Sequence, residues 1–190
     1  MKIIRALPIM ILICCLQGCM NVATSGAEVI YNRHSIQKNL KDQYATLKAY
    51  RALRKTDQFQ NSNIIVSTYN GEMLLAGQTP MHWQKTRAEE LIRKQVDVAR
   101  IYNLITVQGI SSPLTRVSDS WITAKIKAKF LASDDMDGSQ VKVITENGTV
   151  YLMGTLLPEH AETAIDLASN TQGVQRVVKI FSYMKISKKI

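Results

Sequence analysis

The sequence predicts an α+β protein that consists of two copies of one unit, each with two helices packed on a small three-stranded sheet. Three observations lead to this prediction. A segment rich in β-forming residues recurs in the second half of the chain, helical patterns flank it on both sides, and another β-rich run closes each copy. A self-similar period of this kind indicates a repeated structural unit, and a sheet that buries one face needs helices to cover it.

The centre of each unit is a predicted β-hairpin. Residues 64–77 read IIVSTYNGEMLLAG and residues 141–154 read VKVITENGTVYLMG, with Asn-Gly at the same place and a glycine six residues after that pair. Asn-Gly between two β-rich runs favours a two-residue turn, because both turn residues must tolerate a positive φ. Six residues are therefore assigned structural roles in the hairpins: Asn70, Gly71, Gly77, Asn147, Gly148 and Gly154.

A helix is predicted before each hairpin. In the first unit it covers residues 40–55, and the apolar side chains near its buried face are Leu40, Tyr44, Leu47 and Leu53. In the second unit it covers residues 118–131, and its core stripe at i, i+4 spacing is Ile122, Ile126 and Phe130. Ser118 is a suitable N-cap for this helix, and Asp119 in the first turn is favoured by the helix dipole.

A second helix and a final strand follow each hairpin. The helices are expected over residues 83–97 and 159–171, each preceded by a proline, and the strands over residues 101–109 and 175–184. The resulting domains are residues 39–109 and 118–186, joined by a linker of residues 110–117. Because domains of about 70 residues are marginally stable alone, packing of one unit on the other would add stability.

The first 18 residues are predicted to be a secretory signal, because a short basic region precedes an apolar run that is too short for a membrane-spanning helix of about 20 residues. The segment Leu16-Gln17-Gly18-Cys19 resembles a bacterial lipobox. This resemblance implies that Cys19 carries acyl chains and that residues 19–38 form a tether. Since residue 20 is methionine and not aspartate, it also implies sorting to the outer membrane, with the protein facing the periplasm. The alternative is a buried apolar helix with incidental cysteines.

Composition argues against catalysis and against a bound metal or cofactor. All three cysteines lie within the first 20 residues, and the three histidines are not spaced as a ligand pair. The rest of the chain therefore offers no disulfide and no thiolate metal site. The adjacent carboxylates Glu89-Glu90 and Asp134-Asp135 do not converge on one substrate atom, and no Gly-rich phosphate loop or nucleophile elbow is present. We expect a non-enzymatic protein with no cofactor, no metal and no catalytic residue.

The repeated unit resembles the BON domain, a module of periplasmic and outer-membrane proteins associated with phospholipids. The resemblance is strongest in the second unit and is carried by Val143, Gly148, Val150, Leu152, Gly154, Ala164, Ala168, Gly173, Val174 and Val177. The first unit has Asp97 where the second has Gly173, so its helix exit is expected to differ. With the lipobox, the chain is similar to outer-membrane lipoproteins that have two BON domains. This implies binding of anionic phospholipid by the second domain and support of outer-membrane integrity, including at division sites.

The first helix of the second unit has side chains that suit a lipid surface. Trp121, Lys125 and Lys129 are four residues apart beside the core stripe. Indole prefers the bilayer interface, and lysines attract anionic headgroups. We predict that phospholipid of the phosphatidylglycerol type binds at Trp121, Ile122, Lys125, Ala128 and Lys129. The alternative is that Trp121 is half-buried between the two domains and that the lysines form an ordinary solvated face.

The charge distribution leaves other partners open. The formal net charge is +9, and residues 20–117 carry 13 basic and 7 acidic side chains against 9 and 8 in residues 118–190. Export argues against nucleic acid as the partner, and Tyr44 and Tyr50 are expected in the core or at the domain interface. The basic residues of the first helix can give a second, electrostatic membrane contact or dock a protein: Lys48, Arg51, Arg54 and Lys55.

Two other functions compete with lipid binding. One is a protein-interaction or chaperone module of the outer-membrane protein assembly machinery, which would use the hairpin edges or the basic first helix. The other is a structural spacer whose activity is to be tethered.

Overall fold

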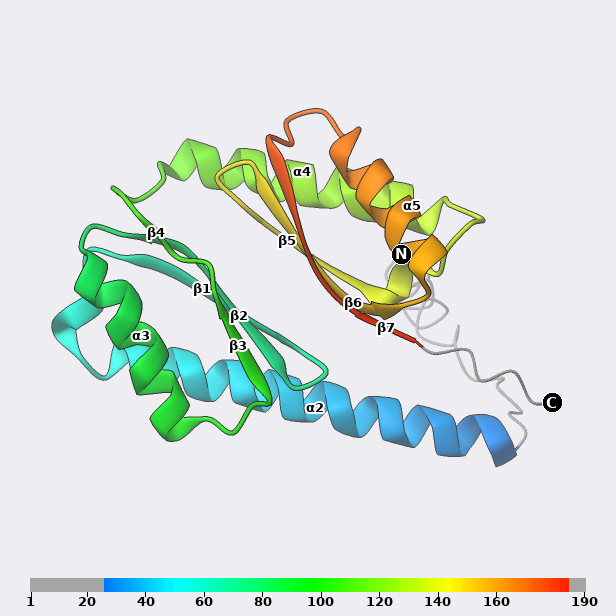
Figure 1. Ribbon diagram of the computed structural model, residues 1–190, viewed down its shortest axis with the longest axis horizontal. Coiled ribbons are helices and arrows are strands. Elements are labelled where there is room, and N and C mark those ends of the chain that lie inside the picture. The colour runs from blue at the N-terminus through cyan, green and yellow to red at the C-terminus, as the bar shows by residue number, and fades with distance from the viewer. Residues whose placement is uncertain (1–25, 185–190) are drawn as a thin grey trace, which may run out of the picture. The chain divides into compact units, whose positions relative to one another are not determined.

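The computed structural model describes residues 26–184, with side chains from Gln37 onward, and it confirms an α+β fold of two repeats (Figure 1). The residues from Lys38 onward form one compact unit. The first repeat contains α2 (Gly26–Arg54), a 3₁₀ turn η1 (Asp57–Phe59), β1 (Asn63–Tyr69), β2 (Glu72–Thr79), α3 (His82–Gln95), β3 (Arg100–Asn103) and β4 (Thr106–Val107). The second contains α4 (Pro113–Leu131), η2 (Gly138–Gln140), β5 (Val141–Glu146), β6 (Thr149–Leu156), α5 (Pro158–Ser169) and β7 (Arg176–Tyr183).

Each repeat has one small mixed sheet. In the first sheet β2 is antiparallel to β1 and parallel to β3 and β4. In the second sheet β6 is antiparallel to β5 and parallel to β7. Parallel neighbours cannot be joined by a tight turn, so α3 and α5 serve as the crossover helices. In each repeat the two helices cover one face of the sheet (Figure 1).

Both hairpins turn at their Asn-Gly pairs. The φ angles are 50° and 79° at Asn70 and Gly71, and 49° and 69° at Asn147 and Gly148, which is the positive-φ geometry of a two-residue turn. The later glycine of the first hairpin also has a positive φ, of 103° at Gly77. In addition, a Cβ on Gly77 would clash with the backbone oxygen of Asn63 in the neighbouring strand β1.

The buried face of α2 differs from the prediction. The core contacts come from Ala45, Ala49, Ala52 and Leu53. Of the four residues predicted for this face only Leu53 is buried, whereas Leu40, Tyr44 and Leu47 are 59%, 63% and 47% exposed. The expected core position of Tyr44 is therefore wrong, while Tyr50 is partly buried and its hydroxyl accepts a hydrogen bond from the amide of Val66. The small alanine face lets the helix lie close to the sheet.

The helix α2 also begins earlier than predicted, at Gly26 and not near residue 40. It therefore occupies part of the segment predicted to be a tether. No proline or glycine interrupts residues 27–54, so nothing in the local sequence stops the helix before Arg54.

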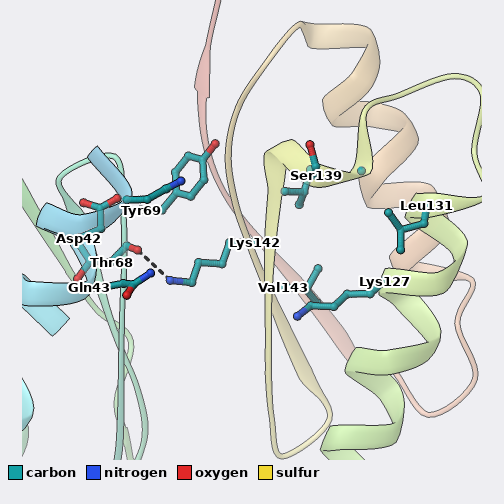
Figure 2. Close-up of a pocket in the computed structure, with 12 residues that line it drawn as sticks. Asp42, Gln43, Thr68, Tyr69, Lys127, Leu131, Ser139, Lys142 and Val143 are labelled. Atoms are coloured by element: carbon teal, nitrogen blue, oxygen red, sulfur yellow. Dashed lines mark hydrogen bonds between the residues drawn. The ribbon is translucent and has the colours of Figure 1, made fainter. Parts of the chain in front are cut away.

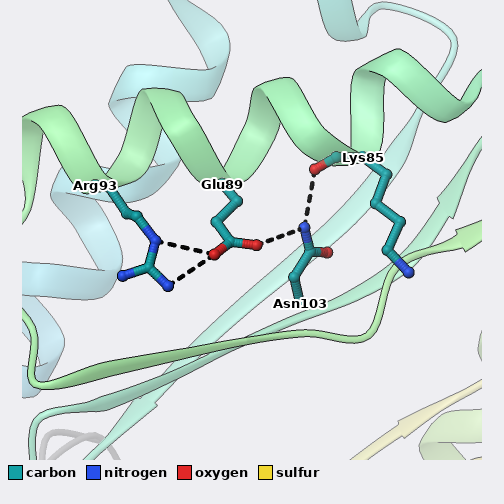
Figure 3. Close-up of polar contacts among 4 residues, drawn as sticks. All are labelled: Lys85, Glu89, Arg93 and Asn103. Atoms are coloured by element: carbon teal, nitrogen blue, oxygen red, sulfur yellow. Dashed lines mark hydrogen bonds and ion pairs between the residues drawn. The ribbon is translucent and has the colours of Figure 1, made fainter.

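The final strand of the first repeat is interrupted, whereas the pattern predicts one strand over residues 101–109. Asn103 lies at the interruption, and its Nδ2 donates to the carbonyl oxygen of Lys85 at 2.9 Å and to Oε2 of Glu89 at 3.1 Å (Figure 3). Arg93 fixes the same Glu89 with Nε and Nη2 at 2.9 and 2.7 Å. These bonds attach the end of β3 to α3. Asn103 Oδ1 also accepts a hydrogen bond from the amide of Ile105 at 3.4 Å, and this local contact competes with regular strand pairing just after β3.

The two sheets pack on each other through the faces that their helices leave uncovered. The shared cluster contains Leu74 and Ala76 of β2, Tyr151 and Met153 of β6, and Ile180 of β7. Alternate residues of the same strands point to the helices, as Met73 and Leu75 do in the first repeat. The order of layers is therefore α2 and α3, first sheet, second sheet, α4 and α5.

Polar contacts across this interface use equivalent positions of the two repeats. Asn63 Nδ2 donates to Oε1 of Glu146 at 2.9 Å, and the Tyr69 hydroxyl donates to the carbonyl oxygen of Gln140 at 3.0 Å. In the alignment of the two repeats Gln140 is the equivalent of Asn63, and Glu146 is the equivalent of Tyr69, so the same patch of each repeat contacts the other. This is the arrangement of an isologous dimer, realised here within one chain.

Candidate functional site

The helix α4 carries the predicted lipid-binding residues. It begins at Pro113, within the predicted linker, and Ser112 is its N-cap, with Oγ accepting a hydrogen bond from the amide of Thr115 at 3.1 Å. Ser118 lies inside the helix, so its assignment as N-cap is wrong. A serine followed by proline is a strong helix start, because proline at the first helical position loses no intrahelical hydrogen bond.

The buried face of α4 includes one of the predicted lipid-binding residues. Ile122 is 3% exposed and packs in the core of the second repeat with Ile126 and Phe130. Its predicted contact with lipid is therefore wrong for the folded protein, because the side chain lies beneath the helix.

The opposite face of α4 is an exposed apolar stripe. Its residues follow each other at alternating spacings of three and four, and we call them the α4 stripe: Leu114, Val117, Trp121, Ala124, Ala128 and Leu131. Leu114, Trp121 and Leu131 are 78%, 68% and 77% exposed. This exposure rules out the alternative that Trp121 is half-buried between the domains. The structure thus places Trp121 and Ala128 on one solvent-facing surface, as lipid contact requires.

The two predicted lysines lie at one edge of this surface, next to the end of α5. Lys125 Nζ donates to the carbonyl oxygen of Gln172 at 2.7 Å, and Lys129 Nζ donates to that of Asn170 at 2.8 Å. Cations are favoured at a helix C-terminus, where backbone carbonyls lack intrahelical partners. Both lysines therefore stabilise the packing of α4 on α5, and Lys125 remains exposed to solvent.

Each hairpin turn is held by an aspartate of the preceding helix, which sequence reasoning missed. The oxygens of Asp119 accept hydrogen bonds from two turn amides at 2.7 and 2.9 Å, and those of Asp42 do so at 2.6 and 2.9 Å. The amides belong to Asn147 and Gly148, and to Asn70 and Gly71. Asp42 and Asp119 occupy the same position of the repeat, and this equivalence is the signal that could have revealed the pairing.

A groove of about 400 Å³ lies where the two repeats meet, between α2 and β1 on one side and α4 and β5 on the other (Figure 2). Figure 2 shows Lys142 extending from β5 towards the first repeat, where its Nζ donates to the carbonyl oxygen of Thr68 at 2.9 Å. Burial lowers the pKa of Lys142; the nearby Asp42 opposes this shift and Lys127 adds to it. Lys142 therefore joins the two repeats at this groove through its bond to Thr68.

Lys142→Met should remove a pH-dependent contribution to stability. Because the pKa of Lys142 is lower in the folded protein, the unfolded chain binds this proton more tightly. The free energy of unfolding of the wild type, relative to Lys142→Met, should therefore rise with pH between the lowered pKa and about 10.4, the ordinary value for lysine. Chemical denaturation of both proteins across this range would measure it, and a difference that is constant or falls with pH would contradict the assignment.

The adjacent carboxylates Glu89 and Glu90 are each held by cations of their own helix. Glu89 is bound by Arg93 and Asn103, and Glu90 by Arg87 at the surface. In the part of the chain that the structure describes, no group of three or more His, Cys, Asp or Glu side chains could hold a metal ion. Within residues 26–184, none of the helices has the length and apolar character of a membrane span. Cys19 and the predicted signal of residues 1–18 lie outside the described residues.

Comparisons with known proteins match both repeats. The model of the BON domain matches residues 41–109 and 118–184. The chain is 38% identical over 138 residues to the 21 kDa hemolysin of Actinobacillus pleuropneumoniae, covering 72% of this chain and 71% of that protein. It is 32% identical over 174 residues to the outer membrane lipoprotein DolP of Haemophilus influenzae, covering 89% of this chain and 90% of that protein. It is 26% identical to the osmotically-inducible protein Y of Escherichia coli, covering 81% of this chain and 78% of that protein.

Proposed function

The chain belongs to the BON-domain family, and we propose that it is a non-enzymatic lipoprotein of the outer membrane that binds anionic phospholipid through the α4 stripe. Similarity to a protein named outer membrane lipoprotein DolP, over most of both chains, supports the location. In this proposal acyl chains on Cys19 hold the protein on the periplasmic side of the membrane, where it supports membrane integrity, including at sites of division.

The observation that carries this proposal is the exposed α4 stripe. A contiguous row of large apolar side chains on the solvent face of a helix marks a binding surface, and a helix of this kind can lie in the plane of a lipid interface. Trp121 at the middle of the stripe can place its ring among the acyl chains and keep its N–H in contact with water and headgroups.

The charge required for anionic lipid comes from the edges of the stripe. Lys125 is exposed on one side, and Lys127 on the other side forms no hydrogen bond or ion pair with the described residues. Each lysine near an anionic surface contributes about 1 kcal/mol to binding. Such a contact is weak in isolation, but the anchor on Cys19 would raise the effective concentration of the domain at the membrane.

Trp121→Ser should lower the affinity for vesicles that contain phosphatidylglycerol by about tenfold, because it removes the largest apolar side chain from the stripe. Trp83→Ser is the matched control, since Trp83 is also exposed, at 48%, but lies on α3 of the first repeat. Cosedimentation with phosphatidylglycerol-containing and neutral vesicles measures both variants. Equal affinities for Trp121→Ser and Trp83→Ser would refute lipid binding by α4.

The alternative is a protein-interaction module of the outer-membrane protein assembly machinery. The alternating spacing of three and four in the α4 stripe supports it, because this spacing also fits a helix of a partner protein. Under this alternative Trp121→Ser leaves vesicle binding unchanged and disrupts a protein complex instead.

A further inference from the structure

The helix α2 has an exposed stripe of its own, although the apolar pattern predicts a buried position for Leu40, Tyr44 and Leu47. Leu40, Tyr44 and Leu47 face the solvent, and Arg51 and Arg54 continue the same spacing of four and three. We call these five residues the α2 stripe. Tyr44 is the equivalent of Trp121 in the alignment of the repeats, so both repeats present an aromatic side chain at the same position of the same helix.

The surroundings of the α2 stripe are strongly basic. Residues 38–55 contain six basic side chains and one acidic side chain, Asp42. The carboxylate of Asp42 is bonded to the amides of the first hairpin turn. None of the six basic side chains forms a hydrogen bond or ion pair with the part of the chain that the structure describes. On α4, by contrast, two of the lysines donate to carbonyls at the end of α5.

The two stripes lie on opposite sides of the paired repeats. Each helix packs on its own sheet, and the sheets pack on each other. The residues of each stripe are on the exposed side of their helix, away from the sheet, although Leu131 at the end of the α4 stripe also lines the groove between the repeats. The stripes therefore point in opposite directions, and one flat surface cannot contact both at once.

We propose that the α2 stripe is a second contact for anionic lipid, on the opposite side of the protein from the α4 stripe. Apolar residues with a tyrosine among unpaired cations are typical of a helix that lies in a lipid interface, and the excess positive charge complements an anionic surface. The lipid contact of α2 does not depend on the function proposed for α4. If both contacts form, one molecule bridges two anionic lipid surfaces, and this bridging does rest on the function proposed for α4.

Residues 20–190 are suited to the test, because they contain both cores and the whole interface between the repeats but lack the predicted signal and Cys19. The wild type should bind and cluster vesicles of phosphatidylcholine with phosphatidylglycerol, as measured by cosedimentation and light scattering. Arg51→Gln with Arg54→Gln should still bind through α4 but no longer cluster the vesicles. When Arg51→Gln and Arg54→Gln are added to Trp121→Ser, the affinity for these vesicles should fall about 30-fold below that of Trp121→Ser alone, because each lost charge costs about 1 kcal/mol.

The matched control is Arg87→Gln with Lys94→Gln, which removes the same charge from α3 in the same layer. It should leave clustering intact. The proposal is overturned if the α2 pair clusters vesicles like the wild type, if it leaves the binding of the Trp121→Ser protein unchanged, or if the α3 pair has the same effect. If Trp121→Ser leaves binding unchanged and the α2 pair abolishes it, the α2 contact is supported and the function proposed for α4 is refuted.

Discussion

Glu146→Ala should lower the free energy of unfolding by about 4 kcal/mol, because one buried carboxylate oxygen ties together three segments of the chain. Glu146 is 4% exposed, and its Oε1 accepts hydrogen bonds from Gln78 Nε2 at 2.7 Å, Asn63 Nδ2 at 2.9 Å and Ser111 Oγ at 3.0 Å. Without the carboxylate, these donors of the first sheet and the linker have no acceptor there. Hydrogen bonds to a charged group are each worth about 1.5–3 kcal/mol and do not simply add.

Two further variants distinguish the loss of the Glu146 hydrogen bonds from the effect that any glutamate substitution has on stability. Glu146→Gln keeps an oxygen where Oε1 lies, so it should cost roughly 1 kcal/mol, the difference between charge-assisted and neutral hydrogen bonds. Glu162→Ala removes the same side chain from an exposed position of α5 and should change stability by less than about 0.5 kcal/mol. Urea denaturation measures all three. A cost for Glu146→Ala no larger than that for Glu162→Ala would contradict this role of Glu146.

The hairpins and the repeat were predictable because their signals are local. Asn-Gly needs no distant partner to favour a turn with positive φ, and the same chemistry occurs twice at one offset. The start of α4 is also marked in the sequence, by Ser112 followed by Pro113, whereas the strongest apolar pattern follows Ser118 and favours a later start. The choice between these serines depends on the whole N-terminal motif and not on the capping residue alone.

The buried face of α2 and the contacts of Glu146 could not be predicted from local sequence signals. The apolar pattern favoured Leu40, Tyr44 and Leu47 because they are large, whereas packing on the sheet selected the alanines at positions 45, 49 and 52. Glu146 looks like a solvated strand residue until a second sheet covers its face. Both features are set by contacts between segments far apart in the sequence, which periodicity does not report.

Asp119→Ala should lower the free energy of unfolding by about 3 kcal/mol, because it removes the acceptor of two turn amides. Asp119 is 5% exposed, and the amide of Gly148 that it accepts from is buried, so water cannot replace the carboxylate there. An unsatisfied buried donor costs about 1–3 kcal/mol. The variant therefore loses both the attachment of α4 to the hairpin and the group that favours the positive-φ turn.

The first repeat supplies an internal comparison for this prediction. Asp42→Ala removes the equivalent bonds, but Asp42 is half-buried and the amide of Asn70 is exposed. Water can satisfy that amide, so Asp42→Ala should cost only about 1 kcal/mol. Asp134→Ala, at an exposed loop position, is the control and should change stability by less than about 0.5 kcal/mol. Equal costs for Asp42→Ala and Asp119→Ala would show that burial does not set the strength of these contacts. A cost for Asp119→Ala as small as that of the control would refute the role of Asp119 itself.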